Sequence, residues 1–430
     1  MIIGALIFWT LASGEQPAQF RGNPLHTGVY EAPRVNPVGH LKWKFHTNGR
    51  VISSPAVENG AVYFGATDGR LYAVEAQGGA LLWKARMEAS ITSSPAVSGD
   101  RVFFGCYDGN FYSLDKKTGK TLWTFKTEGE RRFIGTRLHG SEPRAEAMPD
   151  PFDCFLSSPT VVDGTVYFGS GDGNVYSLDE ATGALNWKFK TGDVVHASPA
   201  IANGVLYVGS WDTYFYALDA KSGQVLWKFK TGEDPDIHNQ TGIQSSAAVA
   251  DDTVYFGCRD SNFYALDAKT GAKKWQFDNK GSWVVGSPAV RDGKVFFGTS
   301  DTSLFYEFDG ASGSPVFSME FHKWPLFSSP SIAGDRLYIG SNEGKLYSID
   351  IAGHKLAWTF QTEACKSHAR IYRKDDGTPN YEAAFSSNFY DDMIVGVNKL
   401  YEMGAIQSSP VISGGKIYFG SVDGNVYALE

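Results

Sequence analysis

Short segments in which apolar and polar residues alternate recur along this chain, and glycine-containing turns separate them. One set of four reads SSPTVV (157–162), TVYFGS (165–170), NVYSLD (174–179) and LNWKFKT (185–191). The turns between them are Asp163-Gly164, Asp172-Gly173 and Thr182-Gly183. A period of two residues bounded by such turns predicts short antiparallel β-strands. We therefore expect one four-stranded antiparallel unit here.

The same unit repeats about every 40 residues, the period of a propeller blade. Its first strand is marked by Pro55, Pro95, Pro159, Pro199, Pro288, Pro330 and Pro410, with Ala247 in the equivalent position of SSAAV. Two insertions interrupt the spacing, at about 128–156 and 363–406. The pattern predicts an all-β, eight-bladed β-propeller with four-stranded blades over residues 41–430. The strand at 41–47 has no first strand before it, so we expect it to complete the C-terminal blade and close the ring.

The turn between the third and outermost strands carries a second motif, Asp-x-x-Thr-Gly-x-x-x-Trp. In the first copy quoted above it consists of Asp179, Thr182, Gly183 and Trp187. The motif resembles the tryptophan-docking motif of the quinoprotein (PQQ-like) propeller superfamily, and the resemblance covers nearly the whole chain after residue 40. It implies that one aromatic residue per blade docks between blades: Trp43, Trp83, Trp123, Trp187, Trp227, Trp275, Phe317 and Trp358. Two copies depart from the pattern, at Phe317 and at Gly353-His354.

Within this superfamily the chain is similar in size and repeat to outer-membrane-assembly propeller proteins, and also to the propellers of PQQ-dependent dehydrogenases. The first similarity implies a scaffold that binds a protein partner. The second implies PQQ and calcium as cofactors and an alcohol or sugar as substrate. The chain has no Cys after its N-terminal apolar run to accept a lipid anchor, and no C-x-x-C-H motif to attach a heme.

Composition and charge narrow the functional classes. The 430 residues include 48 Gly and 14% aromatic residues, and the net charge of −8 comes without any basic block. A nucleic-acid partner is therefore excluded, because phosphate binding needs a concentrated basic face. The apolar run Ile2–Ala12 is too short to span a membrane and predicts a signal peptide at 1–14, followed by a lead segment at 15–40. We expect a periplasmic or secreted monomer without a transmembrane segment.

Ligand-binding residues of a repeat scaffold are expected where its copies differ. Both insertions connect consecutive blades, so both lie on one face of the ring, which we call the top face. The candidate ligand-binding residues on this face are Arg50, Asp153, His196, Trp211, His238, Gln244, Arg259, Trp283, His322, Trp324 and Gln407. The three tryptophans among them either form a stacking platform for a planar or sugar-like ligand or pack beneath the insertions. No H-x-x-x-H or C-x-x-C spacing predicts a metal site.

Two further features concern the insertions. Cys154 is predicted either to bridge to Cys106 or to remain, with Cys258 and Cys365, a free buried thiol. The segment 386–404 predicts one short helix that Ser387 or Asn388 caps and Gly404 ends, lying across the channel mouth as a lid.

Three functions remain open on the sequence. The absence of a recognisable nucleophile, metal or heme motif favours an exported binding or assembly scaffold that uses its top face. A PQQ-dependent dehydrogenase is the first alternative, with an anionic quinone held by Trp283, Trp324, Arg50 and Arg259 and a base at Asp153 or Asp234. A carbohydrate-binding or carbohydrate-processing protein that uses the top-face aromatic residues is the second alternative.

Overall fold

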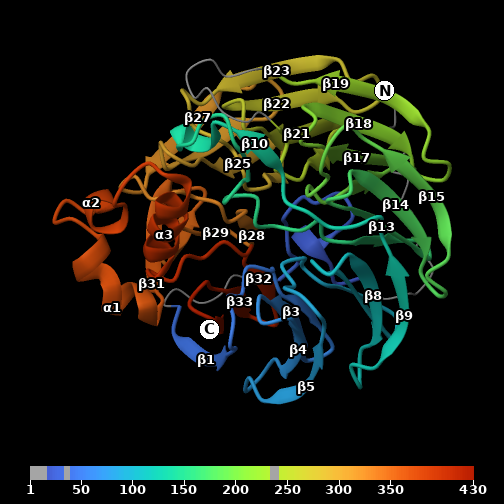
Figure 1. Ribbon diagram of the computed structural model, residues 1–430, viewed down its shortest axis with the longest axis horizontal. Coiled ribbons are helices and arrows are strands. Elements are labelled where there is room, and N and C mark those ends of the chain that lie inside the picture. Colours follow the sequence, from blue (N-terminus) through green and yellow to red (C-terminus); the bar gives the residue numbers. More distant parts are fainter. Residues whose placement is uncertain (1–16, 33–38, 233–241) are drawn as a thin grey trace, which may run out of the picture.

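The computed structural model describes residues 17–32, 39–232 and 242–430. Eight four-stranded antiparallel sheets surround a central channel (Figure 1), as predicted. Blades one to four consist of β2 (Ala56–Glu58), β3 (Ala61–Ala66), β4 (Arg70–Glu75) and β5 (Leu81–Arg86); β6 (Ala96–Ser98), β7 (Arg101–Gly105), β8 (Asn110–Asp115) and β9 (Thr121–Lys126); β12 (Thr160–Val162), β13 (Thr165–Gly169), β14 (Asn174–Asp179) and β15 (Leu185–Lys190); and β16 (Ala200–Ala202), β17 (Val205–Gly209), β18 (Tyr214–Asp219) and β19 (Val225–Lys230).

Blades five to seven follow the same order, from the innermost to the outermost strand. They consist of β20 (Ala248–Ala250), β21 (Thr253–Gly257), β22 (Asn262–Asp267) and β23 (Lys273–Asp278); β24 (Ala289–Arg291), β25 (Lys294–Gly298), β26 (Leu304–Asp309) and β27 (Pro315–Glu320); and β28 (Ser331–Ala333), β29 (Arg336–Gly340), β30 (Lys345–Asp350) and β31 (Lys355–Gln361). Blade eight contains β32 (Val411–Ser413), β33 (Lys416–Gly420) and β34 (Asn425–Leu429), and its outermost strand is β1 (Leu41–His46).

The two ends of the propeller sequence close the ring, as predicted. Strand β1 pairs antiparallel with β34, so that Trp43 lies opposite Ala428 and His46 opposite Asn425. The pairing removes the exposed edge that β34 would otherwise present to solvent.

The recurring serines link neighbouring blades around the channel. In each link a serine backbone N–H donates to the serine hydroxyl of the next blade at about 3 Å: Ser54 to Ser94, Ser94 to Ser158, Ser158 to Ser198, Ser198 to Ser246, Ser246 to Ser287, Ser287 to Ser329, and Ser409 back to Ser54. Between blades seven and eight the Ser328 hydroxyl donates to the Ser408 carbonyl at 2.8 Å. These bonds satisfy buried polar groups that would otherwise be unpaired.

Six docking tryptophans join their own blade to the next one through the indole N–H. Trp83 donates its indole N–H to the Lys116 carbonyl of the following blade at 2.9 Å. Gly119 lies against the same indole with φ 70°, and a Cβ there would come within 2.5 Å of the ring. The position therefore requires glycine both for its backbone conformation and for its close approach. Equivalent N–H to carbonyl bonds are made by Trp43, Trp123, Trp187, Trp227 and Trp275.

The junction between blades six and seven replaces this arrangement. His354 occupies the position of the docking glycine and stacks on Phe317, with ring centroids 4.7 Å apart and planes within 6°. Buried Glu307 lies opposite Phe317 in the sheet, pairs with the half-exposed Lys294 at 2.6 Å and lies 3.1 Å from Nε2 of His354. The smaller phenyl ring leaves room for the imidazole that an indole would exclude.

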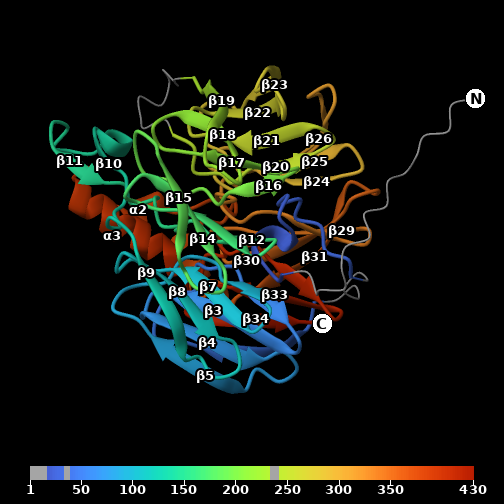
Figure 2. The same ribbon diagram turned by 90° about the vertical axis from the view of Figure 1, so that its right-hand side faces the viewer.

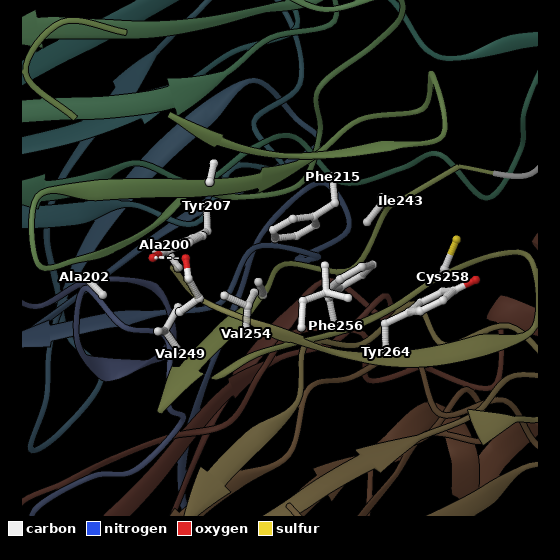
Figure 3. Packing of buried hydrophobic residues seen from close by; sticks show 14 residues of the cluster. Ala200, Ala202, Tyr207, Phe215, Ile243, Val249, Val254, Phe256, Cys258 and Tyr264 are labelled. Atoms are coloured by element: carbon white, nitrogen blue, oxygen red, sulfur yellow. Dashed lines mark hydrogen bonds between the residues drawn. The ribbon is translucent and has the colours of Figure 1, made fainter. Parts of the chain in front are cut away.

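Aromatic residues also fill the space between the blades. Phe215 of β18 and Phe256 of β21 stack across the interface of blades four and five, with centroids 4.2 Å apart (Figure 3). The same contact joins Phe111 to Phe168. Stacked pairs of this kind add to the burial energy of the rings and fix the distance between sheets.

The N-terminal segment 17–32 closes one end of the channel, which the sequence did not predict. It lies at the centre of the ring (blue in Figure 1) and contains the short helix η1 (Phe20–Gly22). Its backbone carbonyls at residues 24, 25, 27 and 28 accept N–H bonds from the innermost strands of blades four, five, six and seven. Arg21 is buried there and donates to the Pro288 carbonyl at 3.0 Å.

Both insertions cover the opposite end, the top face (Figure 2). The first forms a ribbon of β10 (Ile134–Thr136) and β11 (Ala147–Pro149) with the short helix η2 (Leu138–Gly140). The second forms α1 (Glu363–Tyr372), α2 (Tyr381–Ala384) and α3 (Tyr390–Tyr401). The two meet where the Tyr390 hydroxyl donates to the Pro149 carbonyl at 2.6 Å.

The predicted helix in 386–404 is present as α3, but its predicted N-cap is wrong. Helices α1 and α2 of the same insertion were not predicted, and Thr362 caps α1 by accepting the Cys365 N–H at 3.1 Å. At α3 the N-cap is Phe389, which makes no side-chain cap bond, so neither Ser387 nor Asn388 caps the helix. Gly404 lies just beyond α3 with φ 76°, consistent with its predicted role.

The predicted signal peptide at 1–14 lies outside the described residues. Within residues 17–32, 39–232 and 242–430, no helix is long and apolar enough to cross a membrane.

Candidate functional site

Residues 150–156 of the first insertion lie across the top mouth of the channel. The Phe152 carbonyl accepts a bond from the Gln244 side chain, ahead of blade five, at 2.8 Å. The Cys154 thiol lies 3.9 Å from the side-chain oxygen of Gln407, ahead of blade eight. Beneath this segment the channel retains a cavity of about 40 Å³, lined by the inter-blade serines and by Phe20 from the opposite end. The channel is therefore closed at both ends by the chain itself.

His196 holds this insertion to blade four. Its Nδ1 lies 2.6 Å from Asp153 and its Nε2 lies 2.9 Å from Glu130, and both carboxylates belong to the insertion. Burial alone would lower the pKa of His196, but the two carboxylates raise it to about 10. Asp153 also accepts the Phe133 backbone N–H at 2.6 Å. The three side chains form a buried ion-paired group in which both imidazole nitrogens of His196 are occupied.

A second buried charge cluster is centred on Arg259. Its guanidinium lies 3.8 Å from the Trp283 ring centroid and 4.6 Å from that of Trp211, and it pairs with Asp150 at 3.0 Å. Burial would raise the pKa of Asp150, but Arg259 and His139 hold it well below its usual range. The insertion thus supplies the counterion of an arginine held between two indoles.

Phe133 completes the cover over Trp211. The two rings stack with centroids 4.6 Å apart, and Trp211 is buried. Trp324 is also buried and donates its indole N–H to the Gly377 carbonyl of the second insertion at 2.9 Å. These two tryptophans therefore pack beneath the insertions.

An apolar cavity of about 390 Å³ lies between the second insertion and blades six and seven. Its aromatic lining is Phe152, Trp283, Trp324, Phe327, Tyr381, Phe385 and Tyr401. Tyr381 of α2 is 49% exposed, so the cavity reaches the surface beside this residue. A largely apolar cavity of this size with a few polar groups, here Asn342 and Asp301, is typical of binding sites.

The structure distributes the predicted residues over three places. Asp153, His196, Gln244 and Gln407 surround the channel mouth; Trp211 and Arg259 form the cation–π cluster; Trp283 and Trp324 line the apolar cavity. Arg50 lines a different cavity, so it does not join Arg259 in one site. His322 is exposed and lines none of these cavities. His238 and Asp234 lie outside the described residues.

The sequence missed the residues by which the insertions complete these clusters: Glu130, Phe133, Asp150, Phe152 and Tyr381. An insertion has no equivalent in the other blades, so a comparison between repeats cannot rank its residues. The four cysteines are buried free thiols, so the Cys106–Cys154 alternative is not formed.

The described residues do not match a site for a quinone with calcium. Arg259 occupies one face of Trp283, and Phe152 packs against the same indole with centroids 6.0 Å apart. Asp150 and Asp153 are engaged with Arg259 and His196. Among residues 17–32, 39–232 and 242–430, no group of three His, Cys, Asp or Glu side chains is placed to hold a metal ion.

The fold and the docking motif define a PQQ-like eight-bladed propeller whose top face is rebuilt by two insertions. The family described as outer membrane protein assembly factor BamB matches residues 33–148, 142–282 and 259–376. The chain belongs to this family, which confirms the predicted superfamily. Comparison with curated protein sequences finds no match.

Solved structures share the fold. BamB from Moraxella catarrhalis superposes with a TM-score of 0.63 at 15% identity, over 91% of this chain and 98% of that one. Quinohemoprotein alcohol dehydrogenase from Comamonas testosteroni gives a TM-score of 0.70 at 14% identity, over 96% and 80%. A europium-containing methanol dehydrogenase gives a TM-score of 0.67 at 14% identity, over 96% of this chain and 98% of that one. At these identities the similarity shows the fold alone.

Proposed function

We propose that this protein is an exported scaffold that binds a protein partner through its insertion-bearing top face. The observation that carries the proposal is the apolar cavity that opens beside Tyr381, between α2 and blades six and seven. A protein partner fits this site because an apolar side chain of a polypeptide can fill the cavity while its backbone stays at the surface. Membership of a family described as an assembly factor supports the same function.

Exposed apolar side chains on the insertions add to this surface. They are Ile134 on β10, Ile371 on α1, Tyr381 on α2, Phe389 at the N-cap of α3 and Val395 on α3, each close to half exposed or more. The outermost strands also expose apolar residues, such as Leu226 on β19, but these recur from blade to blade. The exposed apolar residues of the insertions have no equivalent in the other blades, and exposed apolar side chains beside a cavity are typical of an interaction surface.

Site-specific crosslinking tests the proposal. A photoreactive phenylalanine analogue at position 381 is expected to capture one partner from the cells that produce the protein, and the same analogue at position 226 is the matched control. The captured protein is then purified and titrated against the variants Tyr381→Asp and Leu226→Asp. We expect Tyr381→Asp to weaken binding at least tenfold and Leu226→Asp to leave it unchanged. Equal loss in both variants, or crosslinking at position 226 alone, would contradict the proposal.

A quinone-dependent oxidoreductase is the second candidate, supported by the fold similarity to the two dehydrogenases. The insertion would have to leave the channel mouth before a planar quinone could reach Trp283. Equilibration with PQQ and calcium, followed by the absorption spectrum and dye-linked alcohol oxidation, separates the candidates. The scaffold proposal predicts no retained quinone and no turnover.

A further inference from the structure

A second cavity, of about 590 Å³, lies on the other side of α3. Val397 and Tyr401 of this helix line both cavities. The remaining wall comes from the connections and top loops of blades one and two, from the first insertion and from α3, and includes Arg50, Thr67, Thr92, Arg132, Ile394 and Asn398. The cavity forms only where both insertions meet the propeller.

Two arginines without carboxylate partners line this cavity. Arg50 donates to the Asn398 side-chain oxygen at 2.9 Å and lies over the Tyr401 ring, 5.7 Å from its centroid. Neither Arg50 nor Arg132 has an ion pair with any residue in the described part of the chain, whereas Arg70, Arg259 and Arg373 all do. No Asp or Glu is among the described residues that line the cavity.

One carboxylate outside the cavity lining, that of Asp153, acts on Arg132 and is already hydrogen-bonded elsewhere. Asp153 acts on Arg132, but its two oxygens accept from His196 and from the Phe133 N–H. Asp153 is fully buried and does not line the cavity. Asp153 thus stabilises the charge of Arg132 without an ion pair, so exposed Arg132 and half-buried Arg50 keep guanidinium N–H groups that no carboxylate of the described residues pairs with.

Hydroxyl groups add further donors to the cavity wall. Thr67 accepts the Arg50 backbone N–H at 2.8 Å, and Thr92 accepts the Leu156 N–H at 3.1 Å. Each hydroxyl keeps its own hydrogen available, because neither donates in a hydrogen bond within the described residues. Two guanidinium groups and two hydroxyl donors form a set that is complementary to an oxyanion.

We propose that this cavity binds a small organic anion with two or more carboxylate or phosphate groups. Guanidinium groups bind both kinds of oxyanion through paired N–H donors, and one anion would neutralise both arginines at once. The volume exceeds that of a single inorganic ion, so the ligand class has an organic body that contacts Ile394 and Val397 of α3.

Calorimetric titration of the full chain tests this proposal without a protein partner, so its outcome is independent of the proposed scaffold function. The probes are citrate and succinate for carboxylates, glycerol phosphate and inorganic phosphate for phosphates, and glucose as a neutral control. We expect at least one of the four anions to bind at millimolar or lower concentration, and glucose not to bind. The preferred anion distinguishes a carboxylate ligand from a phosphate ligand.

Substitutions locate the site. Arg50→Gln and Arg132→Gln are each expected to weaken anion binding at least tenfold. The matched control is Arg131→Gln, because Arg131 neighbours Arg132 but pairs with Asp193 and does not line the cavity. Circular dichroism of each variant checks that it folds. Failure of all four anions to bind, or an equal effect of Arg131→Gln, would overturn the proposal.

Discussion

Buried charges at two residues, His196 and Arg259, fix the first insertion over the channel. Each lies on the propeller and takes its carboxylate partners from the insertion. A buried charge without a partner is costly, so each pair is satisfied in only one position of the insertion. Ion pairing of this kind gives the top face a defined surface although its residues belong to no strand of a blade.

The charge of His196 gives folding a distinct pH dependence. Asp153 and Glu130 raise the pKa of His196 to about 10 against burial, whereas an unfolded histidine titrates near about 6.5. The stabilisation is therefore complete below about pH 6.5 and is lost as the pH rises toward about 10. Between pH 7 and pH 9 we expect this residue to remove about 2 kcal/mol from the free energy of unfolding.

Urea unfolding of the wild type and of His196→Gln at several pH values measures this contribution. The variant is expected to be less stable at pH 7 and to lose less stability on going to pH 9. Parallel pH profiles of the two proteins would contradict a charged His196.

The buried pair between Asp150 and Arg259 is expected to contribute far more to the free energy of unfolding than an exposed pair. Asp150→Ala leaves the Arg259 charge buried and unpaired, so we expect a loss of about 3 kcal/mol. Asp193→Ala breaks the exposed pair with Arg131 and is expected to cost less than about 1 kcal/mol. Urea titrations at pH 7 compare the two, and equal losses would show that Arg259 is not held as described.

For the two buried charge clusters, around His196 and around Arg259, the sequence predicted the residues on the propeller but not their partners on the insertion. Trp211, His196 and Arg259 were identifiable because they interrupt a repeat that the other blades preserve. Asp150 and Glu130 were not, because their contacts depend on how the insertion crosses the ring. Whether these residues bind a ligand remains a prediction.

Among the elements, the junction of blades six and seven shows how the docking motif can change without breaking the ring. Phe317 and His354 differ together from the tryptophan and glycine of the other blades, and their rings stack. The two substitutions are complementary in volume, so changing one alone should overpack the junction.

A double-mutant cycle tests this complementarity. Phe317→Trp alone should lower the free energy of unfolding by about 2 kcal/mol, because His354 occupies the space that the indole needs. Adding His354→Gly should recover most of that loss. Additive effects of the two changes, measured by urea unfolding, would contradict the proposed packing.

The strands were predictable and several other elements were not. Period-two alternation and Gly turns locate β12–β15 in the sequence, because these residues pack the same way in every blade. Helix α1 and the channel-closing segment 17–32 carry no such period, and their positions depend on tertiary contacts such as the bond from Arg21 to Pro288. Repeats reveal elements that are copied, but not elements that occur once.

Strand β1 closes the ring of the whole molecule. We therefore expect the docking tryptophan on β1 to contribute as much to the free energy of unfolding as a docking tryptophan elsewhere in the ring. Trp43 donates to the Ala76 carbonyl and Trp227 to the Ala268 carbonyl, both at 3.0 Å. We expect Trp43→Ala and Trp227→Ala each to cost about 3 kcal/mol or more. Thermal and urea unfolding compare them, and a negligible effect of Trp43→Ala would indicate an open ring.

We propose that partners bind this propeller at the top face, which the two insertions rebuild. Hydrogen–deuterium exchange of the full chain, with and without the partner captured at position 381, measures where the partner binds. We expect partner-dependent protection in residues 379–401 and around Trp283, with unchanged exchange in the outermost strands β5 and β19. Protection confined to those outermost strands, with the insertions unaffected, would contradict the claim.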